Sequence, residues 1–183
     1  MNVSGERTFA APRATVWHVL NDPESMAKTM PGVESFDVHD DRRWTANVKI
    51  PLGLGGLKMK VSMEKTEERE PEFAKMAIKG QGVGAMMSMQ TSFDLSDAEG
   101  AGTLMKWAAD VKIAGPVGSM GQRVLQPIVN QQVQHVLTAL EGQVQEAMAG
   151  GAPATHGAEE GISPASPEAY EADPEGPTTS TED

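Results

Sequence analysis

Large apolar side chains alternate with small or polar ones in four segments of the middle of the chain, and many of them are methionines. The four apolar sets are Met59, Val61 and Met63; Met76 and Ile78; Met87, Met89, Thr91, Phe93 and Leu95; and Met105, Trp107, Ala109, Val111 and Ile113. Because successive side chains of a strand point to opposite sides, each set is expected on one buried face of a sheet.

The choice of methionine on these faces bears on what they pack against. Methionine is unbranched and polarizable, so it suits a surface that adapts to an irregular or changing neighbour better than a core packed once. The pattern therefore favours a sheet curved around an apolar cavity. A soft, closed core explains the methionine content equally well.

Turn residues divide the rest of the first 115 residues into short elements. A strand from about Val3 to Ala10 precedes a helix that begins near Pro12, and Asp22 and Pro23 are typical of the start of a second, brief helix. After Met30-Pro31-Gly32 the pattern predicts strands at Val33 to Val38, Arg43 to Pro51, Leu57 to Glu68, Phe73 to Lys79, Ala85 to Leu95 and Thr103 to Ile113. The short turns between them predict antiparallel pairing.

The apolar spacing becomes helical after Gly115-Pro116 and stays so to about Met148. One predicted face carries Val117, Met120, Val124 and Ile128, and a second carries Val129, Val133, Val136, Leu140 and Val144. The change of face falls at Pro127, where we expect a kink or break, because proline removes a helical hydrogen bond and clashes with the preceding turn.

These elements predict an α+β fold in one domain, residues 1–148. A curved antiparallel sheet of about seven strands wraps around a long C-terminal helix, with two short helices after the first strand. Residues 149–183 are rich in Ala, Gly, Pro, Ser, Thr and acids. We expect this tail to be disordered, because it cannot bury enough apolar surface to become ordered.

Charge and composition limit the function classes. The net charge is −11, but the tail holds eight acids and no Lys or Arg, so residues 1–148 carry 18 acids against 15 bases, a net charge of −3. A nearly neutral domain argues against nucleic-acid binding, which requires a clustered basic surface. The chain has no cysteine, which excludes disulfides and thiolate metal sites. No apolar run has the length of a membrane span or signal peptide, so we expect a cytoplasmic protein.

The order of elements and the residues at their junctions resemble the carbon monoxide dehydrogenase G-subunit (CoxG) family of the START/Bet v 1-like (SRPBCC) superfamily, which has the helix-grip fold. The resemblance covers about residues 3 to 147. It is carried by Ala11-Pro12, Val16-Trp17, Leu20-Asn21-Asp22-Pro23, Met30-Pro31-Gly32-Val33-Glu34, Ala114-Gly115-Pro116-Val117 and Gly121-Gln122-Arg123.

The resemblance implies a non-catalytic accessory protein of a molybdenum hydroxylase of the carbon monoxide dehydrogenase type, whose subunits are its expected partners. Such a protein takes part in assembly, membrane recruitment or electron hand-off. Some family members end in an apolar anchor, whereas this chain ends in Thr181-Glu182-Asp183. We therefore expect at most peripheral contact with the inner face of the cell membrane, and a related hydroxylase stays open as the partner.

The ligand hypothesis places a lipophilic molecule, such as a lipid or an isoprenoid quinone, in the cavity, with no covalent cofactor. Burial of apolar area drives such binding. The predicted ligand-binding residues are Trp44, Val48, Met59, Val61, Met63, Met76, Met87, Met89, Phe93, Met105, Trp107, Met120, Val124 and Ile128. Two alternatives stay open: a ligand-free assembly or adaptor protein, and a cyclase- or hydrolase-like enzyme of the same superfamily, for which Thr91 or Asn47 is the best polar candidate.

Neither a catalytic site nor a metal site is predicted. The histidines are scattered, and no two have the spacing of metal ligands: His18, His39, His135 and His156. The glycines at 80, 82 and 84 precede a strand, so a hairpin explains them better than a nucleotide loop. The glycines at 53, 55 and 56 have the same interpretation, with the further option that this hairpin gates the cavity or contacts a partner.

Overall fold

The computed structural model describes residues 1–52 and 55–150. Nearly all of the predicted tail, together with Gly53 and Leu54 of the glycine-rich hairpin, lies outside these residues. The strands are β1 (Asn2–Phe9), β2 (Val33–Val38), β3 (Arg43–Leu52), β4 (Gly55–Arg69), β5 (Phe73–Gly82), β6 (Ala85–Ala98) and β7 (Gly102–Ala114). The helices are α1 (Arg13–Asn21), α2 (Pro23–Thr29) and α3 (Gln122–Ala149), with single 3₁₀ turns η1 (Glu99–Ala101) and η2 (Gly118–Met120).

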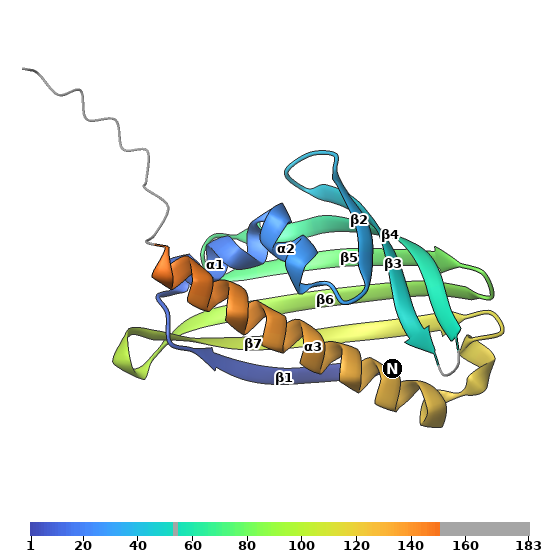
Figure 1. Ribbon diagram of the computed structural model, residues 1–183. Coiled ribbons are helices and arrows are strands. Elements are labelled where there is room, and N and C mark those ends of the chain that lie inside the picture. The colour runs from blue at the N-terminus through green and yellow to red at the C-terminus, as the bar shows by residue number, and fades with distance from the viewer. Residues whose placement is uncertain (53–54, 151–183) are drawn as a thin grey trace, which may run out of the picture. The chain divides into compact units, whose positions relative to one another are not determined.

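The described strands form one antiparallel sheet in the order β1-β7-β6-β5-β4-β3-β2. Six of the seven strands are joined in sequence, and β1 pairs with β7 at the far edge. The sheet curves, and α3 lies across its concave side, with α1 and α2 covering one end (Figure 1). The predicted fold class, a helix-grip arrangement, is confirmed.

The two short helices begin where the sequence predicts. Pro12 precedes the first residue of α1. The Asp22 Oδ2 atom accepts a hydrogen bond from the Ser25 backbone N–H at 2.8 Å, which satisfies one free donor of α2, and Pro23 is the first helical residue. The junction Leu20-Asn21-Asp22-Pro23 therefore ends one helix and starts the next with a single spacer residue.

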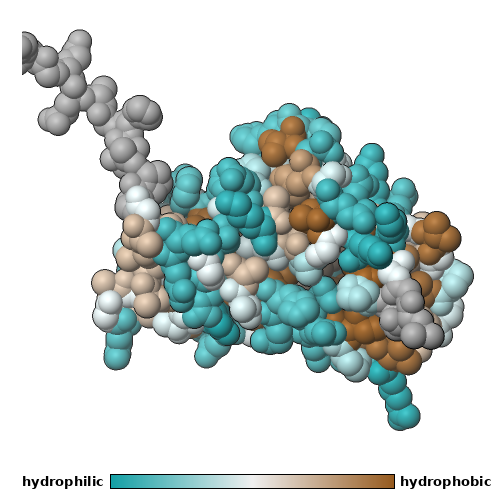
Figure 2. All heavy atoms as spheres, viewed as in Figure 1, coloured by the Kyte–Doolittle hydropathy of each residue, from teal (hydrophilic) through white to brown (hydrophobic). Residues whose placement is uncertain are grey.

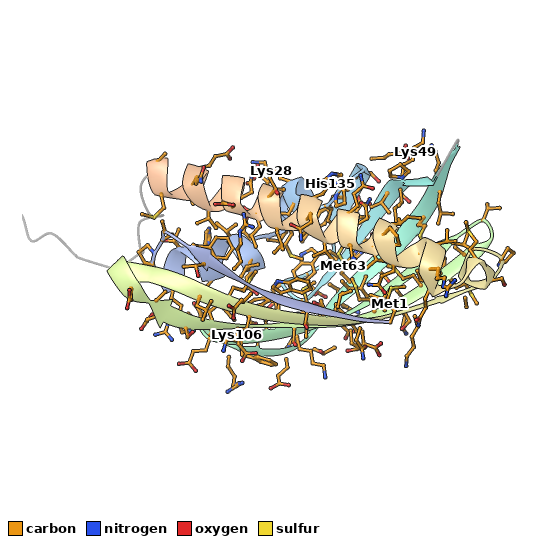
Figure 3. All side chains as sticks on the ribbon, turned by 90° about the horizontal axis from the view of Figure 1, so that it is seen from below. Met1, Lys28, Lys49, Met63, Lys106 and His135 are labelled. Atoms are coloured by element: carbon orange, nitrogen blue, oxygen red, sulfur yellow. The ribbon has the colours of Figure 1, made fainter. Side chains whose placement is uncertain are left out.

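Alternation along the strands separates the two faces of the sheet as predicted. Met59, Val61 and Met63 of β4 are buried, at 3–4% exposure, whereas the lysines between and before them are exposed. On β7, Asp110 lies on the outer face next to the N-terminal amine and the Lys112 ammonium, both 3.8 Å away. Figure 3 shows the same division, with Met63 inside and Lys106 outside.

Most buried apolar side chains of the described residues form two clusters that α3 contacts unequally. The first joins Leu137, Leu140 and Val144 from the second half of α3 to α1 and to one end of the sheet. The second consists of side chains from β3 to β6 with α2, β2 and Val117 packed against it, and α3 contributes to neither its buried nor its partly buried members. The first half of α3 is therefore held over the sheet rather than packed into this second cluster.

The path into α3 differs from the prediction. Gly115 and Gly121 have positive φ values of 85° and 79°, so the chain turns twice, with η2 between, before α3 begins at Gln122. From there α3 continues as one helix through Pro127, so the predicted break is wrong, whereas the alternative of a kink at Pro127 stays a prediction. Pro127 lies only one and a half turns from the start of α3, so the hydrogen bond it removes is near an end where backbone groups are already unpaired.

Candidate ligand cavity

A cavity of about 410 Å³ lies between α3, the concave face of the sheet and the α2 side of the molecule. This volume is within the range of roughly 300–1,000 Å³ that is typical of small-molecule sites. From α3, the lining side chains all belong to one helical stripe: Leu125, Ile128, Val129, Gln132, Val133, Val136, Leu137 and Leu140. In Figure 3, side chains from the helix and from the sheet point toward one another across the interior.

Most of the residues predicted to bind a ligand line this cavity. They are Val48, Met59, Val61, Met63, Met76, Met87, Met89, Phe93, Met105, Trp107 and Ile128. They come from β3, β4, β5, β6, β7 and α3, so the methionine-rich faces that the alternation predicts do converge on one space. Whether these side chains bind a ligand stays a prediction.

Three predicted residues are not part of the lining. Trp44 is buried at 1% exposure on the inner face, but it packs next to Lys65, whose ammonium lies 5.9 Å from the ring centroid. Met120 and Val124 are 49% and 44% exposed. The prediction for these two residues assumed one continuous helix from Val117. The chain reverses at Gly121 before α3 begins, so the helical phase does not extend from η2 into α3.

The structure adds lining residues that the sequence analysis did not assign to a ligand. The stripe of Val129, Val133 and Val136 was recognised as apolar, and its place in the lining follows once α3 is known to start at Gln122. A second group comes from α1, α2 and the turn that follows: Val19, Leu20, Met26, Thr29, Met30 and Pro31. Two residues of the junction motif Met30-Pro31-Gly32, Met30 and Pro31, therefore line the cavity.

The end of α2 contributes to a second hollow as well as to the cavity. A shallow groove of about 390 Å³ runs between α2 and α3 and is lined by Lys28 and His135 on its outer side. Thr29, Met30 and Pro31 line both the groove and the cavity. Figure 3 shows Lys28 and His135 near each other on the helical side of the molecule.

The polar groups of the cavity are few and uncharged. Among the described residues its polar lining side chains are Thr29, Thr91, Ser92 and Gln132, and no Asp, Glu, His, Lys or Arg is included. The Thr91 hydroxyl donates to the Ala108 carbonyl oxygen at 3.1 Å. Asn47, the other candidate for an enzyme, lies on the outer face and donates to the Ser35 hydroxyl at 2.7 Å.

Two residues of the lining each have a polar atom that is buried away from the cavity and has no hydrogen-bond partner among the described residues. These atoms are Oε1 of Gln132 and Nε1 of Trp107. The indole of Trp107 lies over Gly5 of β1, where an added Cβ would come within 3.3 Å of Nε1. Unpaired polar atoms are uncommon in protein interiors, and each requires a physical reason.

Sites for metals and nucleotides find no positive support in the described part of the chain. No group of three metal-ligating side chains is found there; His39 is engaged with the Thr45 hydroxyl at 3.0 Å, and His156 lies outside the described residues. Gly80 and Gly82 belong to β5 and Gly84 to the turn before β6. A Cβ on Gly80 would come within 2.7 Å of the Met59 methyl group, so this glycine makes room for a cavity methionine.

Within residues 1–52 and 55–150, no helix is long and apolar enough to span a bilayer.

A curved sheet that grips a long helix over an apolar cavity defines the class: a START-like helix-grip protein. The chain belongs to the carbon monoxide dehydrogenase G-subunit (CoxG) family, whose model matches residues 5–145. No curated protein matches the chain.

Solved structures share the fold at low sequence identity. A conserved protein from Geobacillus kaustophilus is 19% identical with a TM-score of 0.75, over 80% of this chain and 97% of that one. A START superfamily protein from Mycobacterium smegmatis is 18% identical with a TM-score of 0.62, over 79% and 97%. The Zhui aromatase/cyclase from Streptomyces sp. R1128 is 16% identical with a TM-score of 0.62, over 82% and 98%. These likenesses show the fold alone.

Proposed function

We propose that this protein is a non-catalytic accessory of a molybdenum hydroxylase of the carbon monoxide dehydrogenase type, and that it holds a lipophilic molecule such as an isoprenoid quinone in its cavity. The observation that carries the proposal is the apolar space of about 410 Å³ between α3 and the sheet. The family assignment supports the partner. We place the protein in the cytoplasm, with peripheral membrane contact at most, and the acidic tail as a tether or docking segment.

The chemistry of the lining supports an apolar ligand held mainly by burial. Each CH₂ group removed from water contributes about 0.8 kcal/mol, and the flexible methionines of β4 to β6 adapt to an irregular tail. A series of quinones with increasing tail length is therefore expected to bind more tightly with each added unit until the cavity is full. An affinity that ignores tail length contradicts binding in this cavity.

The direct test is to identify what the purified full-length chain carries. Native mass spectrometry and organic extraction are expected to recover one quinone-like molecule per chain. As a second measurement, a short-tailed quinone is expected to quench the fluorescence of Trp107, which lines the cavity, more than that of Trp17 or Trp44, which lie outside it. Recovery of an empty chain that no quinone quenches would rule out the carrier function.

A ligand-free adaptor is the second candidate, because large apolar side chains are exposed on the surface. Val83 is 94% and Met86 is 58% exposed, in and just after the turn that joins β5 to β6. The Val117 N–H donates to the Gly84 carbonyl oxygen at 3.0 Å, which places this turn beside the chain leading to Met120. Figure 2 shows hydrophobic surface at the same end of the molecule. An exposed apolar group of this kind fits a protein partner.

Two methionines of β6 separate the two candidates. Met89 lines the cavity, whereas Met86 is exposed three residues earlier on the opposite face. For a carrier, Met89→Lys is expected to abolish ligand binding and keep hydroxylase binding, and Met86→Lys to keep the ligand. For an adaptor without a ligand, Met86→Lys is expected to weaken hydroxylase binding and Met89→Lys to change nothing except stability. Pull-down with the hydroxylase and quinone titration measure the two properties.

The lining supports the non-catalytic part of the proposal. General acid–base and nucleophilic catalysis require a titratable or activated group in contact with the substrate. The described lining offers hydroxyl, amide and indole groups without a base beside them. An enzyme of this fold remains the third alternative, and Thr91 is its best-placed hydroxyl.

A further inference from the structure

Four of the six exposed large apolar side chains among the described residues lie at one end of the molecule. They are Val83, Met86, Met120 and Val124, which we call the apolar tip. Met86 pairs with Ala114 at the end of β7, and the Val117 N–H donates to the Gly84 carbonyl oxygen. The β5–β6 turn and the chain through η2 are therefore neighbours, as Figure 1 shows, and Figure 2 shows hydrophobic surface at this end.

Basic side chains gather at the same end. Six of them are exposed and come from β3, β4, β5, β7 and the start of α3: Lys49, Lys58, Lys60, Lys79, Lys112 and Arg123. Lys58 and Lys60 flank the β4 residue that pairs with Gly82, at the β5–β6 turn. Lys49 is opposite Lys58 in the sheet, and Figure 3 shows Lys49 at the surface of this end.

The charge of this end is opposite to that of the rest of the domain. The segments that carry the six bases, residues 47–51, 56–60, 79–90 and 111–124, contain no Asp or Glu. The remainder of residues 1–148 holds 18 acids against nine bases. Within the described part of the chain, two acids from outside these segments pair with the group, Glu34 with Lys58 at 3.3 Å and Asp110 with Lys112 at 3.8 Å. Most of this positive charge is therefore uncompensated.

The cavity reaches the end that carries the apolar tip. Ala85, Val117 and Leu125 line the cavity. Ala85 and Leu125 are direct sequence neighbours of two residues of the apolar tip, and Val117 precedes a third by three residues. A molecule that leaves the cavity at this end therefore emerges beside exposed apolar side chains and lysines.

We propose that this end docks on a membrane surface that contains anionic lipids, with the apolar tip in the head-group region and the six bases against the lipid phosphates. Apolar side chains are stabilised there by loss of contact with water, and basic ones by the negative surface potential. The acidic remainder of the domain is repelled, so the charge separation orients the molecule. The inference rests on the proposed function, because an isoprenoid quinone is dissolved in the bilayer.

The composition of this surface favours a membrane over a protein partner. Five of the six bases are lysines, and lysine is depleted in protein–protein interfaces, whereas it is typical of segments that bind anionic lipids. The apolar side chains belong to separate turns rather than to one groove. A fluid lipid surface accommodates such separate groups without a matching shape.

Vesicle co-sedimentation of the full chain tests the proposal. At about 0.1 M salt we expect vesicles of phosphatidylcholine with about 30% phosphatidylglycerol to bind the chain at least tenfold more tightly than pure phosphatidylcholine vesicles. Raising the salt to about 0.5 M is expected to remove most of this preference, because it screens the lysines.

Val83→Asp tests the apolar contribution, and Val38→Asp is its matched control. Both valines are exposed, but Val38 is on β2 and outside the apolar tip. We expect Val83→Asp to weaken binding to the anionic vesicles at least tenfold, because it replaces a buried apolar group by a repelled charge. Val38→Asp is expected to leave vesicle binding within about twofold of the unmodified chain.

Lys112→Glu and Lys106→Glu form a second matched pair on the outer face of β7. Both lysines are exposed, and six residues of strand separate them by about 20 Å, twice the Debye length of about 10 Å at 0.1 M salt. We expect Lys112→Glu to weaken binding to anionic vesicles about tenfold and Lys106→Glu to change it less than threefold. At high salt the two variants are expected to behave alike.

The outcomes separate this inference from the proposed function. Quenching of Trp107 by a short-tailed quinone is expected to be unchanged in Val83→Asp and Lys112→Glu, since neither residue lines the cavity. A chain that binds quinone but prefers no vesicle overturns the docking surface and leaves the carrier function standing. The proposal also fails if each variant matches its control, or if Val83→Asp loses only the hydroxylase, which would assign this end to a protein partner. A chain that docks on anionic vesicles but binds no quinone contradicts the proposed function instead.

Discussion

Glycine at position 32 is required by both its backbone conformation and its neighbour. Its φ is 69°, a region that favours glycine, and a Cβ there would overlap with the carbonyl oxygen of Lys49 on β3. The Gly32 carbonyl also accepts a hydrogen bond from the Lys49 N–H at 2.7 Å. This close approach fixes the preceding Met30 and Pro31, which line the cavity, against the sheet.

Gly32→Ala is expected to lower the free energy of unfolding by about 2 kcal/mol or more, because the strained conformation and the overlap add. Gly100→Ala is the control, since Gly100 has a similar φ of 70° but nothing within 4 Å of an added Cβ. It should cost only the conformational part, about 1 kcal/mol. Urea denaturation measures both, and equal losses in the two variants would show that the contact with Lys49 contributes nothing.

Lys65 shows where residue-level prediction from the sequence stops. Strand alternation places it on the inner face after Met59, Val61 and Met63, yet a lysine is expected to face solvent. The structure keeps it inside at 6% exposure because its ammonium pairs with the Glu68 carboxylate at 2.8 Å and lies near the Trp44 ring. Neither partner follows from the alternation. Residues three apart point to opposite faces of a regular strand, and the pairing of β4 with β5 shifts between Lys65 and Glu67. The Trp44 contact depends on the register of β3 against β4.

Helices and strands were predicted best where neighbouring residues alone determine them. Alternation and turn residues predicted β2 to the residue, β1 shifted by one residue, and β3 to β7 with ends up to three residues short. The predicted face of α3 with Val129, Val133 and Val136 does line the cavity. Met120 and Val124 of the other predicted face do not, because Gly115 and Gly121 have positive φ values and turn the chain before the helix starts. A glycine in a sequence indicates that a turn is allowed and not that one occurs.

The continuity of α3 through Pro127 leads to a prediction about the stability of this helix. Because α3 continues through this exposed residue, the proline only removes the hydrogen bond to the Arg123 carbonyl and imposes local strain. Pro127→Ala is therefore expected to raise the free energy of unfolding by about 1 kcal/mol, less than the roughly 3 kcal/mol of a mid-helix position. Thermal unfolding monitored by circular dichroism measures the change.

A loss of stability in Pro127→Ala would instead mean that the proline shapes α3 to fit the cavity. Gly142→Ala provides a reference, since Gly142 lies in the same helix with open space around its Cα. That change should stabilise the helix by about 0.5–1 kcal/mol through helix propensity alone. Comparing the two separates a general helix effect from one that depends on proline.

At the scale of the whole molecule, the cavity depends on what holds α3 away from the sheet. The second half of α3 packs on α1 through Leu137, Leu140 and Val144, and an Arg7–Glu141 ion pair joins it to β1. The sequence indicated which side chains face inward. It did not indicate whether the two layers meet, because that depends on packing between segments more than a hundred residues apart.

Filling the cavity tests it as a property of the folded molecule. Ala109 of β7 lines it, so in Ala109→Leu the added carbons enter the empty space. We expect unchanged or higher stability, by about 1 kcal/mol, because apolar area is buried without displacing other atoms, together with at least tenfold weaker binding of a short-tailed quinone. Ala108→Leu, at the preceding residue on the exposed outer face, should leave binding unchanged. A strongly destabilised Ala109→Leu variant would show that the interior is already filled, and a stable one that binds normally would place the ligand elsewhere.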